Sequence, residues 1–150
     1  MINPLNPACD SGFVPDRLYL LENPGVTEQV QRALDLIAEI TTAYGSNEPE
    51  IRLTTLDSEV EFDRISSFFA EAITEVEDYD DEVAVDITPG RKFMSAIAFA
   101  AGMRYEADHV YYFYLTSPDQ YGQIYPDMPR TATQLYDFRE ALQWRFRART

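Results

Sequence analysis

The sequence has a single cysteine and no long apolar run, and these two absences exclude several kinds of protein. The lone Cys9 rules out an internal disulfide and fits a protein of the reducing cytoplasm. No apolar run approaches the roughly 20 residues that cross a bilayer, and the first residues lack a basic segment followed by an apolar one. We therefore expect a cytoplasmic protein with no membrane partner.

Basic residues are also few. The chain of 150 residues has 26 acidic and 12 basic side chains, a formal net charge of −14, and its basic residues are eleven arginines and Lys92. Such a charge repels extended polyanions, so we expect no long nucleic acid as a partner. The hydrophobic fraction of 45 %, with ten Tyr and nine Phe, is that of a folded protein, and the length suits one domain with one core.

Strand-like and helix-like segments alternate along the chain. Short β-type runs occupy 17–21, 51–56, 83–87 and 109–115. Apolar residues spaced by three and four predict helices over about 26–44, 58–76 and 91–105. Three strand–helix repeats with short connections favour right-handed crossovers. We therefore predict an α/β, Rossmann-like fold, a mostly parallel sheet flanked by helices in a single domain over 1–150.

The two ends of the chain are less regular. Residues 1–16 are rich in Pro, Asn and Asp and predict a turn-rich lead-in. Residues 117–150 begin with a loop rich in Pro, Gly, Asp and Tyr, and the spacing of Leu135, Phe138 and Phe146 predicts a C-terminal helix after it.

Ligands of such sheets bind beyond the carboxyl ends of the strands. The loops at 22–27, 56–59, 86–92 and 115–130 should therefore face one rim of the sheet. Asn23 and Asp57 belong to this rim, where the Asp57 carboxylate could bind ribose hydroxyls or adenine amino groups, or only cap a helix. Arg130 is a further candidate for a phosphate contact.

One segment of this rim has the features of an anion site. The strand at 83–87 ends in Asp86-Ile87-Thr88-Pro89-Gly90, and a helix of small and apolar residues follows at once. Gly90 permits a tight turn, and the helix start offers free N–H groups and the positive end of its dipole. Arg91 and Lys92 add charge, while Thr88 and Ser95 add hydroxyls. The alternative is an ordinary strand–helix turn, which offers the same N–H groups.

The same segment resembles the CRISPR-associated Rossmann fold (CARF) domains. Their motif is Asn/Asp-x-Thr-Gly-Gly-Thr-Lys-x-Met, then a small-residue helix and an aromatic strand. This chain keeps Thr88, Gly90, Lys92 and Met94, and its aromatic strand is Val110-Tyr-Tyr-Phe-Tyr114. It departs from the motif at Pro89 and Arg91. The resemblance spans roughly 15–116, and the family's usual first strand has no clear counterpart in 1–14.

The resemblance implies a ligand, an assembly and a reaction. The ligand is cyclic oligoadenylate, the second messenger of type III CRISPR immunity, with cyclic tetra-adenylate as our first expectation. The assembly is a homodimer with the ring across its two-fold axis. A stand-alone sensor or sponge would only bind the ring, whereas some members cleave it without a metal or cofactor by attack of a ribose 2′-hydroxyl on the adjacent phosphate. The implied catalytic residues are Lys92, Thr88 and Ser95, and the implied ligand-binding residues are Asp86, Thr88, Pro89, Gly90, Arg91, Lys92 and Met94. Asn23, Asp57 and Arg130 are added as ligand-binding candidates because of their place in the predicted rim loops.

Other polar residues give weaker signals. We expect His109 to be structural rather than a general base, Cys9 not to be a nucleophile, and the acidic run 75–82 to be a solvated connection rather than a metal site. A second hypothesis is a noncatalytic α/β module that binds a protein partner through its Tyr-rich loop and an Arg-rich helix containing Arg145 and Arg147. The two hypotheses differ in whether nucleotides bind.

Overall fold

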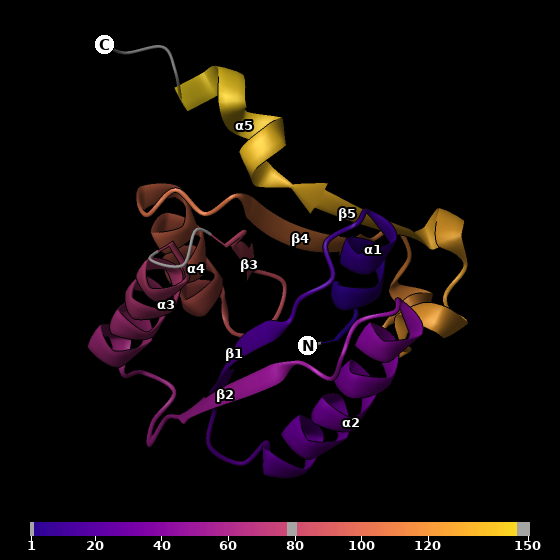
Figure 1. Cartoon of the computed structure of the whole chain (residues 1–150), viewed down its shortest axis with the longest axis horizontal. Helices are drawn as coiled ribbons and strands as arrows, with labels where there is room; N and C mark the ends of the chain where they lie inside the picture. The colour runs from indigo at the N-terminus through magenta and orange to yellow at the C-terminus, as the bar shows by residue number, and fades with distance from the viewer. Residues whose placement is uncertain (1, 78–80, 147–150) are drawn as a thin grey trace.

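The computed structural model describes residues 2–77 and 81–146 (Figure 1). Five strands and five α-helices are present there. The strands are β1 (Arg17–Glu22), β2 (Glu50–Thr55), β3 (Ala84–Asp86), β4 (His109–Leu115) and β5 (Thr133–Asp137). The helices are α1 (Leu5–Asp10), α2 (Thr27–Ala43), α3 (Phe62–Glu77), α4 (Lys92–Arg104) and α5 (Phe138–Phe146). The predicted strand–helix repeats are confirmed.

The strands form two sheets. β1 pairs with β2 in parallel, while β3 and β4 pair in parallel and β5 joins β4 antiparallel. The strand orders are β1-β2 and β3-β4-β5. The α/β, Rossmann-like class with mostly parallel pairing is confirmed. In the described residues the strands form two sheets, because β1 and β3 do not pair.

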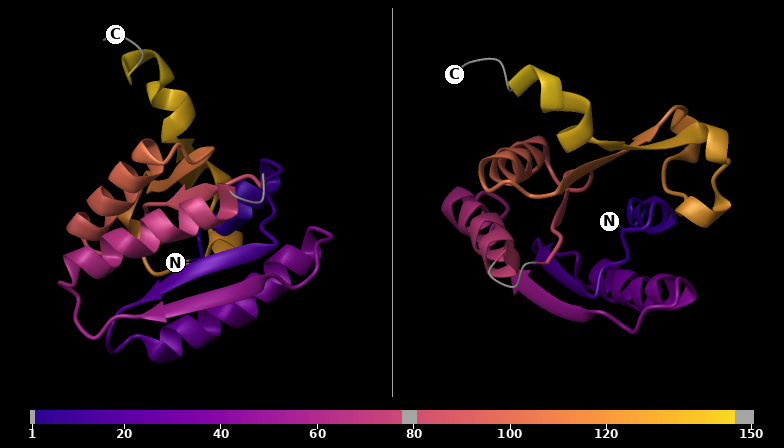
Figure 2. Two further views of the ribbon diagram at one scale, coloured as in Figure 1. Left: turned by 60° about the vertical axis from the view of Figure 1, so that its left-hand side comes forward. Right: turned by 45° about the horizontal axis from the view of Figure 1, so that its top comes forward.

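Helices cover both faces of the strands (Figure 2). α1 and α2 pack together on one face, and α3 and α4 pack together on the other. α3 also contacts β1, while α4 contacts β3 and β4, so this helical layer spans both sheets. Of the described helices, none is long and apolar enough to cross a membrane.

Two elements escaped the sequence analysis. The lead-in 1–16 contains α1, a single short helix that begins after Pro4 and includes Pro7. Its buried Ala8 and Cys9 show that packing, not helix propensity, stabilises it. The segment assigned wholly to loop and helix contains β5, an edge strand whose pairing with β4 no local pattern announces.

The main core lies between β3, β4 and the helices α3 and α4. Ile73, Val85, Ala98 and Val110 are buried there together. Gly102 permits this close approach of α4 to the sheet, because a Cβ atom on it would lie 2.9 Å from Cγ2 of Val110. The small residues Ala98, Ala101 and Gly102, which α4 buries, are therefore required by its packing.

Replacing this glycine by valine should destabilise the fold. Gly102→Val places atoms inside the contact distance of a fully buried Val110 side chain, and we expect a loss of at least about 2 kcal/mol in the free energy of unfolding. Ala100→Val, at an exposed position of the same helix, should cost only about 0.5 kcal/mol of helix propensity. Urea unfolding of both variants measures the difference, and equal losses would contradict this role of Gly102.

Candidate functional site

Three loops meet at the carboxyl ends of β1, β2 and β3. The Asn23 amide after β1 donates to the Met94 sulfur of α4, with 3.7 Å between Nδ2 and Sδ. Glu59, after β2, forms an ion pair with Arg91, with 2.5 Å between Oε2 and Nε. These two contacts confirm that the loops 22–27, 56–59 and 86–92 share one rim, which we call the carboxyl rim.

The fourth loop lies elsewhere. Residues 117–132 fold into three short 3-10 helices and pack against α1. Tyr125 is buried, its ring edge-on to Phe113 at 5.9 Å, and its amide donates to Asn3 Oδ1 at 3.1 Å. The expectation that the loop 115–130 faces the carboxyl rim is therefore wrong. Its aromatic residues instead bind α1 to the sheet.

Hydrogen bonds hold the turn between β3 and α4. The Thr88 amide donates to Asp86 Oδ1 at 2.9 Å, and the Phe113 amide of β4 donates to Thr88 Oγ1 at 2.8 Å. Gly90 has φ +93°, a left-handed conformation that L residues rarely adopt. The turn thus has a fixed shape, and the amide and the hydroxyl of Thr88 both help to hold it.

The environment of Asp86 weakens its acidity. Burial raises the pKa of its carboxyl group from 3.8 to about 6, against the opposing effect of the hydrogen bonds from Thr88. A desolvated carboxyl group that accepts few hydrogen bonds is costly to ionise. At neutral pH Asp86 therefore carries a charge that the fold stabilises only in part.

The two predicted cations of this segment have different surroundings. Arg91 is the N-cap of α4 and is paired with Glu59, which offsets its charge. Lys92 begins α4, is exposed, and takes part in none of the ion pairs found among the described residues. Ser95 lies one turn on, with its hydroxyl donating to Pro89 O at 3.4 Å. The unpaired positive charge of this turn is therefore on Lys92.

The structure does not bring every predicted site residue to this turn. Asp57 is exposed at the carboxyl rim, and Arg64 Nη1 lies 3.3 Å from its Oδ2. Arg130 pairs instead with Asp10 of α1 at 2.6 Å and lies over the Tyr125 ring. The predicted phosphate contact from Arg130 is thus not supported by its position, since its charge is held by Asp10.

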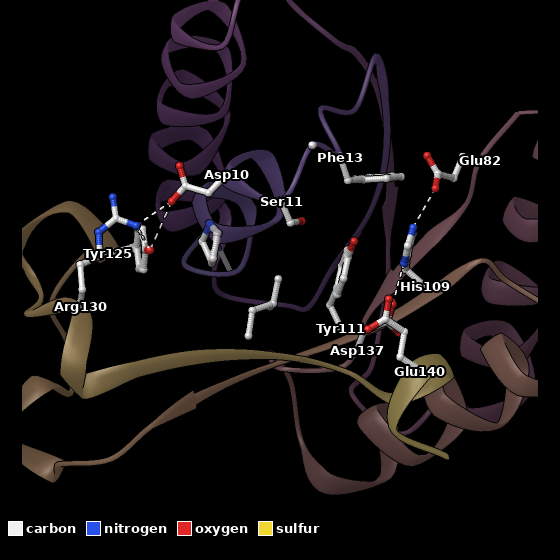
Figure 3. Close-up of a pocket in the computed structure, with 13 residues that line it drawn as sticks. Asp10, Ser11, Phe13, Glu82, His109, Tyr111, Tyr125, Arg130, Asp137 and Glu140 are labelled. Carbon is white, nitrogen blue, oxygen red and sulfur yellow. Dashed lines mark hydrogen bonds and ion pairs between the residues drawn. The ribbon is translucent and has the colours of Figure 1, made fainter. Parts of the chain in front are cut away.

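A cavity of about 710 Å³ is lined by Asp10, Arg130 and His109, among other residues (Figure 3). His109 Nδ1 lies 2.6 Å from Asp137 Oδ2, and Nε2 lies 2.8 Å from Glu82 Oε1. Burial would lower the pKa of His109, but the hydrogen bonds to both carboxylates outweigh it and raise the pKa above its ordinary value. Sequence reasoning missed this cluster because its members are distant along the chain.

The structure also places the weaker candidates. His109 contacts carboxylates from two other segments of the fold, Glu82 before β3 and Asp137 of β5. Burial, aided by the charge of Asp10, raises the pKa of the Cys9 thiol to about 11, so a nucleophilic thiolate is disfavoured. No cluster of metal-ligating side chains is found in residues 2–77 and 81–146. Residues 78–80 of the acidic run, and Arg147 and the side chain of Arg145, lie outside what the structure describes.

Comparison of the whole fold with solved structures gives two informative matches. Can2 from Sulfobacillus thermosulfidooxidans, in complex with cyclic tetra-adenylate, superposes with a TM-score of 0.53 at 20 % identity over 74 % of this chain. Csm6 from Enterococcus italicus, bound to cyclic hexa-2′-fluoro-hexa-dAMP, superposes with a TM-score of 0.58 at 17 % identity over 92 % of this chain.

This chain shares its fold with the matched parts of these two proteins. The match covers 28 % of the Can2 chain and 39 % of the Csm6 chain, so this chain spans well under half of either protein. No family model matches the sequence, and no curated protein matches it significantly. The CARF likeness thus lies in the three-dimensional fold and in the short motif at Asp86–Met94.

The buried carboxyl group at this turn should make stability depend on pH. Between pH 3.8 and about 6 the folded state keeps the Asp86 proton that the unfolded state has released, so stability falls as pH rises and stays lower above this window. Asp86→Asn keeps the oxygen that accepts from Thr88 but cannot ionise. We expect it to raise the free energy of unfolding by about 1 to 3 kcal/mol at pH 8.

Urea unfolding between pH 4 and 8 measures this effect. The gain of Asp86→Asn should shrink toward zero at pH 4, where the side chain is uncharged in the folded state of both the wild type and the variant. Asp57→Asn, at an exposed position of the same rim, should change stability by no more than about 0.5 kcal/mol. A gain of Asp86→Asn that is equal at pH 4 and pH 8 would contradict the raised pKa.

Proposed function

We propose that this protein binds a cyclic oligoadenylate in type III CRISPR signalling, with cyclic tetra-adenylate as the preferred ring, and does so as a homodimer. The observation that carries the proposal is the turn from Asp86 to Lys92. It joins β3 to the start of α4, has a fixed shape, and presents an unpaired cation. Two proteins of the same fold are described as bound to cyclic adenylates.

The chemistry of the turn suits a phosphate. The first turn of α4 has N–H groups without helical acceptors and the positive end of the helix dipole. Lys92 adds a full charge beside them, while Gly90 lets the backbone approach a ligand closely. Pro89 lacks an N–H group, so this turn offers one donor fewer than the CARF motif does.

A dimer would double this charge around one ring. A two-fold axis through the ligand places the same residues on opposite sides of the ring, so one Lys92 from each chain contacts it. The charge of −14 is compatible with such a ligand, because a pocket interaction at a few ångströms exceeds the field of distant, screened carboxylates. Long nucleic acids lack this advantage.

The remaining rim residues supply recognition of the nucleoside. In this proposal the Asp57 carboxylate accepts hydrogen bonds from ribose hydroxyls or adenine amino groups. Asn23 lies beside Met94 and brings an amide to the same position. The Asp86 carboxyl group supports the turn from beneath through Thr88.

We include metal-independent cleavage of the ring in the proposal. The ribose 2′-oxygen attacks the adjacent phosphorus and the bond to the 5′-oxygen breaks, with the 2′ proton passing to water and the 5′-oxygen taking one. Lys92 stabilises the charge that develops on the phosphate. Ser95 and Thr88 orient the 2′-hydroxyl, because a hydroxyl that donates within the protein still has a lone pair to accept with.

Binding is tested with cyclic tetra-adenylate and cyclic hexa-adenylate. We expect a thermal shift with the tetra-adenylate ring, and one ring for each two chains in calorimetry and sedimentation. Lys92→Gln should weaken binding about tenfold or more, since a charge-assisted contact is lost twice in each dimer. Arg104→Gln is the matched control, because Arg104 is exposed at the far end of the same helix, roughly 18 Å away.

Two outcomes would contradict the proposed binding of the ring or the role of Lys92 in it. No thermal shift with either ring at micromolar protein overturns the proposal of binding and favours the noncatalytic interaction module. Equal loss of affinity in Lys92→Gln and Arg104→Gln would show a general charge effect, and the role of Lys92 would be lost.

Cleavage is tested separately, by chromatography of the ring after incubation with protein in EDTA. The expected product is a linear oligoadenylate with a 2′,3′-cyclic phosphate end. Lys92→Gln should slow its formation at saturating ring, and Ser95→Ala should slow it with little change in affinity. An intact ring after prolonged incubation with saturated protein would reduce the function to binding.

A further inference from the structure

Two strand edges of this fold face each other without pairing. β1 pairs only with β2, and β3 only with β4, among the described residues. The strands point the same way, because the residues that follow them meet at the carboxyl rim through Asn23 and Met94 and through Glu59 and Arg91. The strand order is therefore β2-β1, a gap, and β3-β4-β5.

The gap is an open, mostly apolar groove of about 480 Å³. Its walls come from both sheets and from both helical layers, and they include Leu20, Val85, Phe69, Ile73 and Ala8. Leu18, Leu20 and Leu21 of β1 remain only partly buried, although helices cover this region on both faces. An inner strand of a covered parallel sheet normally buries such residues.

Both edges direct backbone groups into the groove. The Glu50 amide donates to Asp16 O and the Leu56 amide to Glu22 O, so the even-numbered residues of β1 bond to β2. Alternation in a parallel ladder then directs the N–H and C=O groups of Tyr19 and Leu21 toward the gap. By the same argument, the bonds between β3 and β4 leave Ala84 and Asp86 facing it.

This arrangement matches a doubly wound sheet from which one inner strand is absent. The common order of such sheets is 3-2-1-4-5-6, and the observed order has every position but the one between β1 and β3. At the carboxyl end of the gap, Asn23 Oδ1 is buried and has no hydrogen-bond partner among the described residues. It is positioned to accept from the backbone that follows a strand in the gap.

We propose that the groove binds an extended, apolar peptide strand donated by a different polypeptide, which inserts parallel to β1 and β3 and joins the two sheets into one. The five strands that the structure describes are already paired, and Ile2 and Leu5 line the groove without filling it. A second copy would offer the same described strands, each of them already paired. The donated strand is apolar on both faces, because helices cover both.

The chemistry of the donated strand is tested with a phage-displayed library of nine-residue peptides randomised at the five central positions. We expect enrichment of β-branched and other apolar residues at all five positions. Enrichment of alternating polar and apolar residues would show that only one face is covered, and no enrichment would show that no strand is accepted. Either result overturns the proposal.

The place of insertion is tested by hydrogen exchange of single amides, measured by NMR. In the free protein the amides of Tyr19, Leu21, Ala84 and Asp86 should exchange much faster than those of Leu20 and Val85. An enriched peptide should slow the first four by at least about tenfold. Strong protection of these four amides in the free protein would show that β1 and β3 already pair, and the proposal would fail.

A pair of variants at the first residue of β3 provides the control. Ala84→Pro removes a donor that faces the groove and leaves the bonds of Val83, Val85 and Ile87 to β4 in place. We expect it to weaken the enriched peptide at least about fivefold. Ala84→Val keeps the donor and should bind within about twofold of the wild type. Equal affinity for the two variants would overturn the proposed hydrogen bonding.

Two measurements test whether a second copy occupies the groove and whether the peptide binds outside it. A homodimer that Ala84→Pro abolishes in sedimentation, without peptide present, would show that a second copy occupies the groove. If a small apolar dye binds in the groove without displacing the enriched peptide, the peptide binds elsewhere. Both results contradict the proposal. None of these assays uses a nucleotide, so a failure of the strand proposal can be distinguished from a failure to bind cyclic oligoadenylate.

Discussion

The hydrogen bond from the Phe113 amide to the Thr88 hydroxyl is the contact on which the carboxyl rim depends. It ties Thr88, the second residue after β3, to the middle of β4, and the Asp86 carboxyl group accepts from the amide of the same threonine. With these two bonds in place the chain must turn at once into α4, and Arg91 and Lys92 emerge at a defined point. Without them, the helix start and its charge would have no fixed relation to the sheet.

Charge on this protein is arranged by pairing rather than by total amount. Arg17, Arg52, Arg64, Arg91 and Arg130 each lie against a carboxylate. These pairs are exposed and contribute little stability, but they offset basic groups over much of the surface. Lys92 lies outside these pairs, as Arg104 does, but it stands at the N-terminal end of α4, where the helix dipole adds to its positive charge. A phosphate at the start of α4 would find both the dipole and the charge.

Much of the fold could be predicted from the sequence, because β1 to β4 and α2 to α4 are elements whose own apolar spacing matches the face they bury. α1 and β5 could not, since each is stabilised by residues distant along the chain. Tyr125 and Asn3 hold α1, and the pairing with β4 holds β5. At the site, the turn from Asp86 to Lys92 was predictable as a local motif. The pairing of Arg130 with Asp10 was not predictable, because it depends on the packing of a long loop.

The separation of the two sheets has a consequence for cooperativity. β1, α2 and β2 form one unit, and β3 to β5 with α4 form another. Among the described residues no strand pairing joins the two units, which are connected by α3, by α1 and by the contacts of the carboxyl rim. Units joined in this way can open at different free energies, as separate foldons. A strand hydrogen-bonded to both edges would couple them, and its binding energy would stabilise both at once. In this protein, the continuity of a sheet would then be a property that another molecule supplies.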